Sequence, residues 1–114
     1  MKIYVAAKWE DKDRAQEVQR LLRDAGHTIT YDWTVNEEEC GAQVENDIDG
    51  VRGADAFVGI FEQDLKYAGA LMEFGAALAM NIPVYILGSA PITRHMFFKH
   101  SNVHLGITQL LKEV

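Results

Sequence analysis

One carboxylate interrupts the most apolar stretch of the sequence, "GALMEFGAALAM" at residues 69–80, in which Glu73 is the only charged residue. We expect a helix that begins near Ala70, which places Glu73 in its first turn. Unpaired N–H groups and the helix dipole favour an anion there. An acid that only complements a helix terminus would occupy the same place. The small residues Gly75 and Ala76, and the lack of other charges, favour a ligand site instead.

A second acid, Asp47, precedes an apolar segment in "ENDIDGVRGAD". On a helical wheel it lies next to Ile48, in the C-terminal half of the expected helix, where the dipole disfavours an ionised carboxylate. The pattern leaves open whether Asp47 lies beside the core or faces solvent. Asp49 lies roughly 200° further around the wheel and is expected to face water.

Two aromatic residues near the start of the chain are further candidates. Tyr4 lies inside an expected strand, and its neighbours Ile3 and Val5 point to the opposite face. Its ring suits a plain core position, and it also suits a place from which the hydroxyl donates to a carboxylate at the strand ends. Trp9 lies in the following loop, where its ring could stack on the ring of a ligand.

His95, His100 and His104 gather in the last quarter of the chain. Their spacing matches no zinc pattern and no cysteine lies nearby, so we expect neither a metal nor a cofactor. No Ser-His-Asp arrangement follows from the spacing either. An anionic ligand and a subunit contact are the two roles left open for these histidines.

Apolar, β-rich segments alternate with helical patterns along the whole chain. The expected strands are residues 2–7, 28–31, 55–61, 83–88 and 102–106, and the expected helices are residues 10–26, 34–52, 70–80 and 107–114. Such alternation predicts an α/β fold with a parallel sheet and right-handed crossovers. We expect one domain over residues 1–114, a three-layer flavodoxin/Rossmann-like domain with five strands in the order 2-1-3-4-5.

The second of these helices is expected to end near Arg52. Thr34 or Asn36 would cap it, with Glu37 or Glu39 as the reciprocal partner. Its inner face is expected to carry Cys40, Val44, Ile48 and Val51.

Composition excludes several classes of function. The formal net charge is −6 and the pI about 5.1, which argues against polymeric DNA or RNA but not against a small ligand with a single phosphate. There is no secretory or membrane-spanning run, and the one cysteine cannot form an internal disulfide, so we expect a cytoplasmic protein. The hydrophobic fraction of 48% suffices for one ordinary core.

Ligands of such sheets bind at the carboxyl ends of the strands, near the switch in strand order. Those ends correspond to residues 6–9 and 61–70. "AAKWED" and "GIFEQD" fit a response-regulator receiver poorly, and neither a flavodoxin phosphate loop, a GxGxxG motif nor a P-loop occurs. The residues that we expect to contact substrate here are Ala6, Trp9, Tyr67, Gly69 and Met72.

Three segments resemble the nucleoside 2-deoxyribosyltransferase family, including its 2′-deoxynucleoside 5′-phosphate N-hydrolase branch. "KIYVAAKW" looks like the first strand of that family, and "NDIDGVRGADAFVGIF" is similar to its segment with an acid, a helix end and the third strand. "GALMEFGAALAMNIPVYIL" resembles its Gly-x-x-x-Glu signature and is the most specific of the three. The resemblance runs from Lys2 to about Gly88, and more weakly through "FFKHSNVHL".

The resemblance implies a role for each candidate. Glu73 becomes the nucleophile, Asp47 the acid near the departing base, and Tyr4 the hydroxyl that orients Glu73. The implied reaction cleaves the N-glycosidic bond of a 2′-deoxynucleoside through a glutamyl-deoxyribosyl intermediate and transfers the sugar to another base. One position departs from the pattern: many family members have Asp or Ser six residues before the nucleophile, where this chain has Tyr67.

The implied partners are a nucleoside or nucleotide and a free nucleobase, bound by a homodimer or higher homo-oligomer. Three alternatives stay open. The first is a hydrolase of 2′-deoxynucleoside 5′-monophosphates, and the second a hydrolase of NAD-like molecules that uses the same glutamate. The third is a nucleotide-binding module without catalytic activity, which tight binding without product would indicate.

Overall fold

The computed structural model describes residues 1–38, 41–64 and 66–112. The expected capping role of Glu39 and the expected inward position of Cys40 fall outside these ranges. Within them, no helix has the length and apolar character needed to cross a membrane.

Five parallel strands form one sheet in the order β2-β1-β3-β4-β5, which confirms the expected topology. The central strands are almost fully buried, which explains their nearly continuous apolar sequences. Their register pairs Tyr4 with Phe57 and Ala6 with Gly59. The strands are β1 (Lys2–Ala6), β2 (Thr28–Ile29), β3 (Ala56–Ile60), β4 (Val84–Leu87) and β5 (Val103–Leu105).

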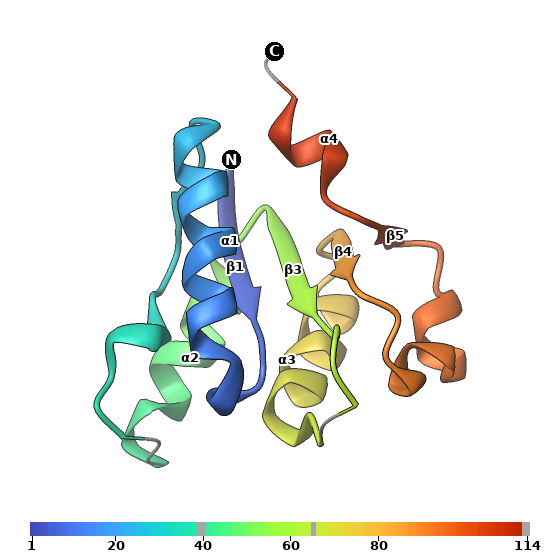
Figure 1. Ribbon diagram of the computed structural model, residues 1–114, viewed down its shortest axis with the longest axis horizontal. Coiled ribbons are helices and arrows are strands. Elements are labelled where there is room, and N and C mark those ends of the chain that lie inside the picture. The colour runs from blue at the N-terminus through green and yellow to red at the C-terminus, as the bar shows by residue number, and fades with distance from the viewer. Residues whose placement is uncertain (39–40, 65, 113–114) are drawn as a thin grey trace.

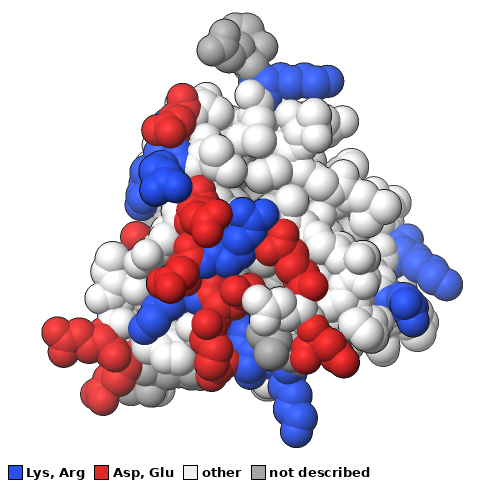
Figure 2. All heavy atoms as spheres, viewed as in Figure 1, with Lys and Arg blue, Asp and Glu red and all other residues white. Residues whose placement is uncertain are grey.

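Within the described part of the chain, four α-helices cover the sheet: α1 (Lys12–Asp24), α2 (Val44–Arg52), α3 (Ala68–Ala79) and α4 (Thr108–Leu111). α1 packs on β1, β2 and α4, whereas α2 and α3 pack on each other and on β1, so the helices form two layers around the sheet (Figure 1). Figure 2 shows acidic and basic side chains interleaved over α1, without a patch of one sign on that face.

Short 3₁₀ turns occupy several connections. They are η1 (Trp9–Asp11), η2 (Trp33–Val35), η3 (Gly41–Gln43), η4 (Pro91–Arg94) and η5 (Met96–Lys99). The expected helix over residues 34–52 was therefore predicted too long, because α2 begins only at Val44.

The capping prediction for that helix was wrong for a local reason. The carboxylate of Asp32 accepts the backbone N–H of Thr34 at 3.0 Å and caps η2, so Thr34 lies inside a separate turn and Asn36 ends it. Asp side chains commonly compete with helical bonding in this way. Val44 was predicted to face the core but is 55% exposed, whereas Val51 is buried as expected.

Gly88 allows the chain after β4 to pass close to the chain after β3. Gly88 has a φ of +102°, and a Cβ there would lie 2.4 Å from the carbonyl oxygen of Phe61. Only glycine fits both the left-handed backbone and this close approach. The two central strand ends thus meet tightly beside the region where ligands of this fold bind.

Candidate active site

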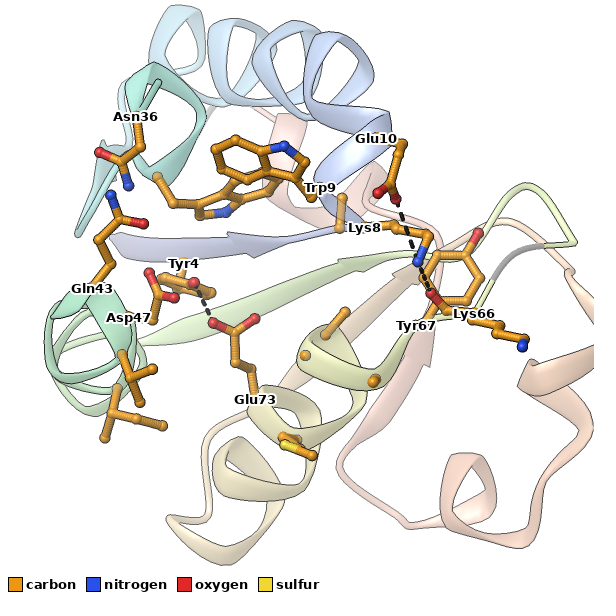
Figure 3. Close-up of a pocket in the computed structure, with 18 of the residues that line it drawn as sticks. Tyr4, Lys8, Trp9, Glu10, Asn36, Gln43, Asp47, Lys66, Tyr67 and Glu73 are labelled. Carbon is orange, nitrogen blue, oxygen red and sulfur yellow. Dashed lines mark hydrogen bonds and ion pairs between the residues drawn. The ribbon is translucent and has the colours of Figure 1, made fainter. Parts of the chain in front are cut away.

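A cavity of about 650 Å³ opens at the carboxyl ends of β1 and β3 (Figure 3). The loop after β1 and η1 form one wall, and η2 with the start of α2 form a second. The N-terminal turns of α3 close the floor. Of the catalytic candidates, Tyr4, Asp47 and Glu73 all line this cavity.

Glu73 does not lie in the first turn of its helix, as the sequence had suggested. α3 begins at Ala68, so Glu73 is its sixth residue and lies in the second turn. The N–H of Leu71 is already bonded to the carbonyl of Tyr67 at 2.8 Å, so the unpaired N–H groups of the helix end earlier. The backbone therefore does not supply the donors that we expected to keep this carboxylate ionised.

Burial dominates the electrostatics of Glu73 instead. Desolvation raises the pKa of its carboxyl to about 7, and the nearby charge of Asp47 acts in the same direction. The hydrogen bond from Tyr4 opposes them and lowers the pKa. Glu73 is thus a partly desolvated acid that exchanges its proton near neutral pH.

Tyr4 donates its hydroxyl proton to Oε2 of Glu73 over 2.6 Å, which is one of the two arrangements that its place in the strand left open and the one that the family resemblance implied. The ring is buried in β1 and stacks on Phe57, with 5.9 Å between ring centroids. Burial, and then the charge of Glu73, raise the pKa of the Tyr4 hydroxyl far above its ordinary value. Tyr4 therefore stays protonated and acts as a donor.

Asp47 lies in the first turn of α2, not in the C-terminal half of a longer helix. The dipole of α2 therefore favours an ionised carboxylate at Asp47, which is the opposite of the effect expected from the sequence. The side chain is half-buried and points toward Tyr4 and Glu73, and its charge raises the pKa of both (Figure 3). Asp49 is exposed, as expected, and pairs with Arg52 at 2.6 Å.

The indole rings of Trp9 and Trp33 both line the cavity. Trp9 lies as the sequence suggested, and its ring centroid is 6.2 Å from that of Trp33. The buried Trp33 donates its indole N–H to the carbonyl of Val5 at 2.7 Å, which ties this wall to β1. The ammonium of Lys12 lies 4.3 Å from the Trp9 ring centroid.

Opposite ends of the cavity differ in chemistry, and sequence reasoning missed the residues at both. The amides of Asn36 and Gln43 point toward each other beside Asp47 at one end (Figure 3). Lys8 and Lys66 lie at the other end, where the Lys8 ammonium donates to the carbonyl of Lys66 and pairs with Glu10. Lys8 follows the end of β1 by two residues, but nothing in the spacing connects it with Lys66.

The remaining substrate-binding candidates are distributed unevenly. Gly69 and the exposed Met72 line the cavity. Tyr67 lines it too, but its hydroxyl is held by the backbone of Gln63, donating to the carbonyl at 2.7 Å. Ala6 is fully buried in β1, and Ala7 borders the cavity in its stead.

The three histidines have local partners away from this cavity. Nδ1 of His95 accepts the N–H of Phe97, and Nδ1 of His100 accepts the N–H of Asn102. The ring of His104 stacks on Tyr85. Among residues 1–38, 41–64 and 66–112, no group of three or more His, Cys, Asp or Glu side chains could hold a metal ion.

The chain is similar to known proteins in both its sequence and its fold. The model of the nucleoside 2-deoxyribosyltransferase family matches residues 3–103. A solved 2-deoxyribosyltransferase from the psychrotolerant bacterium Bacillus psychrosaccharolyticus is 25% identical, with a TM-score of 0.66 over 80% of this chain and 74% of that one. A Clostridium botulinum CMP N-glycosidase is 24% identical, with a TM-score of 0.68 over 92% and 87% of the two chains. No curated protein matches significantly.

Proposed function

The chain belongs to the nucleoside 2-deoxyribosyltransferase family, and on that premise we propose that it cleaves the N-glycosidic bond of 2′-deoxynucleosides with Glu73 as nucleophile. Members of this family are deoxyribosyltransferases or N-glycosidases, so the protein is an enzyme of one of these kinds. The observation that carries the finer proposal is the 2.6 Å hydrogen bond between Tyr4 and Glu73 inside the cavity.

In the proposed first step, the Glu73 carboxylate attacks the anomeric carbon as the bond to the base breaks. The base leaves with the bonding electron pair and takes a proton from Asp47, which enters this step in its protonated form. The product on the enzyme is a neutral glycosyl ester of Glu73, which traps the oxocarbenium-like sugar. Tyr4 stays protonated and holds the carboxylate in one orientation for the attack.

In the second step, an acceptor attacks the same carbon and the ester bond breaks, which returns the electron pair to Glu73. A second nucleobase as acceptor gives a new nucleoside, and Asp47 takes the proton that this base loses. Water as acceptor gives free deoxyribose. Both outcomes retain the configuration at the anomeric carbon, because the sugar is inverted twice.

The burial of Glu73 suits this role. A desolvated carboxylate is higher in free energy than one in water, and forming the neutral ester removes its charge. The attacking form is the ionised one, and the pKa of about 7 leaves a substantial ionised fraction at neutral pH. We therefore expect the ionisation of Glu73 to give kcat/KM an acid limb that rises with pH through about 7.

The test is an HPLC assay that supplies a deoxynucleoside and a second free base. Glu73→Ala is expected to lower turnover at least about 1,000-fold, because no other group can form the ester. Glu45→Ala removes an exposed acid of α2 outside the cavity and is the matched control. Turnover by Glu73→Ala equal to that of the control would refute the proposal.

A second candidate, hydrolysis of 2′-deoxynucleoside 5′-monophosphates, is favoured by the cationic end of the cavity. Lys8 and Lys66 lie beside the N-terminal turns of α3, across from the amide end. Ammonium groups and helix N–H groups both suit a phosphate. A base at the amide end with its sugar over Glu73 would direct the 5′ group toward these lysines.

The two candidates differ in a measurable preference. If a 5′-phosphate is bound, kcat/KM for the monophosphate exceeds that for the nucleoside, and Lys66→Ala reduces only the former, by roughly tenfold or more. Lys99→Ala removes an exposed cation of η5 and serves as control. Equal preference in the wild-type enzyme, untouched by Lys66→Ala, would leave the nucleoside as substrate.

A further inference from the structure

Gly50 lies in the interior of α2 and is buried, although glycine is a poor helix former there. An interior glycine costs about 1 kcal/mol relative to alanine. A Cβ at Gly50 would lie 2.9 Å from Cδ1 and 3.0 Å from Cε1 of the Tyr4 ring, and 2.9 Å from Cβ of Tyr31. Carbon atoms that are not bonded do not approach so closely, so the missing side chain makes room for these two tyrosines.

We propose that Gly50 is a positioning residue that sets the location of the Tyr4 hydroxyl against Glu73. The proposal rests on the function assigned above, in which Tyr4 orients the nucleophile. Gly50 contacts the side of the Tyr4 ring, and the far end of that ring carries the 2.6 Å hydrogen bond to Glu73. A displacement of the ring at Gly50 is therefore transmitted to the carboxylate.

The surroundings leave few ways to absorb an added methyl group. The Tyr4 ring stacks on Phe57 of the buried β3, and its backbone lies in β1 between two paired strands. The neighbouring atom of Tyr31 is its Cβ, which is fixed to the backbone. The Tyr4 ring and the helix α2 are thus the two parts that can move.

Movement of α2 also disturbs the site. Oγ1 of Thr30 donates to the carbonyl oxygen of Gly50 at 2.7 Å and ties this part of α2 to the end of β2. Asp47 lies three residues before Gly50, so both project from the same face of the helix. A retreat of α2 would therefore lengthen the Thr30 bond and shift Asp47 together with the helix.

The matched comparison is Gly75, which also lies inside a helix, α3, and is half-buried. A Cβ at Gly75 meets nothing within 4 Å. No protein atom of the described residues thus approaches Gly75 closely, whereas three side-chain atoms approach Gly50. Alanine is expected to fit without movement at Gly75 and to force movement at Gly50.

The experiment measures the titration of Glu73 directly, by NMR of carboxyl-labelled glutamate, and in parallel the pH profile of kcat/KM. Loss of the Tyr4 bond removes the interaction that lowers the pKa of Glu73, so Tyr4→Phe is expected to move the titration up by about 1 pH unit. Gly50→Ala is expected to move it in the same direction. The double variant is expected to move no further than Tyr4→Phe alone.

Several results would overturn the proposal. A lower melting temperature in Gly50→Ala with an unchanged Glu73 titration would show a purely structural glycine, as would additive shifts in the double variant. Gly75→Ala must leave the titration in place. The NMR titration needs no turnover. A protein without N-glycosidic activity would therefore refute the proposed function, while the titration of Glu73 would still test the role of Gly50.

Thr30→Val supplies a second test if Gly50→Ala does not fold. It removes the hydroxyl that ties α2 to β2 and adds no bulk near Tyr4. Its expected effect is an upward shift of the Glu73 titration smaller than that of Tyr4→Phe. No shift in Thr30→Val, with the fold retained, would overturn the role assigned to the Gly50 position.

Discussion

Replacing Glu73 with glutamine is expected to stabilise the fold at alkaline pH while it abolishes the proposed reaction. The folded protein raises the pKa of this carboxyl from 4.5 to about 7. A group with a raised folded pKa favours folding below its unfolded pKa, and that contribution is lost as pH rises through the folded pKa. Glutamine stays neutral at every pH and still offers an oxygen to the Tyr4 hydroxyl.

The magnitude follows from the same two values. Between pH 8 and pH 5 the wild-type carboxyl should gain about 2.5 kcal/mol of folding free energy, which is part of the roughly 3.4 kcal/mol that 1.36 kcal/mol per unit gives for the whole shift from 4.5 to about 7. Because Glu73 keeps some contact with solvent, 2.5 kcal/mol is an upper value. Glu73→Gln should lack this gain, so its advantage over the wild type is about 2–2.5 kcal/mol larger at pH 8 than at pH 5.

Urea unfolding of both proteins at pH 5 and pH 8 measures this difference, with circular dichroism as the signal. Glu45→Gln changes an exposed acid on α2 and is expected to differ from the wild type by the same amount at both pH values. An advantage of Glu73→Gln that is equal at pH 5 and pH 8 would refute the reasoning, because it would mean that burial does not hold the proton on Glu73.

Three further outcomes are expected. Gly88→Ala should destabilise the fold by about 2–3 kcal/mol, because the added Cβ would meet a backbone oxygen. Gly26→Ala should destabilise it by about 1 kcal/mol, because Gly26 has a φ of +96° but open space around it. Urea unfolding measures both changes. Gln19 is fully buried and its amide has no partner among the described residues, so Gln19→Met should raise the unfolding free energy by about 1–2 kcal/mol. Asp47→Asn removes a charge that raises the pKa of Glu73, so the Glu73 titration, followed by NMR of carboxyl-labelled glutamate, should move to lower pH.

The sheet could be predicted from the sequence because its signals are local and mutually consistent. Apolar runs over β1 and β3 are long enough to indicate strands buried on both faces. Gly26 and Pro83 mark where helical patterns end, and the strict alternation of elements leaves few topologies. Each of these cues depends on the chain's own neighbours and not on distant contacts.

Helix starts were harder to predict, and the errors had consequences for the site. α2 begins later than expected because the side chain of Asp32 stabilises a separate turn, and this later start moves Asp47 from the end of a helix to its beginning. α3 begins two residues earlier than expected, which moves Glu73 out of the first turn. The later start of α2 reverses the effect of the helix dipole expected at Asp47, and the two-residue shift of α3 removes the unpaired N–H groups expected at Glu73.

The ends of the cavity could not be derived from sequence spacing at all. Asn36 follows η2 whereas Gln43 ends η3, and Lys8 and Lys66 lie on loops far apart in the chain. They meet only because β1 and β3 are neighbours and α2 packs against α3. Their types are unremarkable for loops, so tertiary structure alone reveals that one end of the cavity carries amides and the other carries cations.

The helix dipole does not explain how the Glu73 carboxylate is tolerated inside the apolar helix α3. Desolvation alone would push the pKa of Glu73 higher and leave little of the ionised form, whereas the Tyr4 hydroxyl lowers it. The two opposing effects hold the carboxyl near pH 7, where it is reactive when ionised and has a charge to lose on forming an ester. The balance depends on a hydroxyl at 2.6 Å, and that distance depends in turn on the space left by Gly50 beside the ring. The glycine inside α2 and the buried carboxylate of α3 are therefore coupled through the Tyr4 ring. A change at Gly50 or at Tyr4 should be visible in the titration of Glu73.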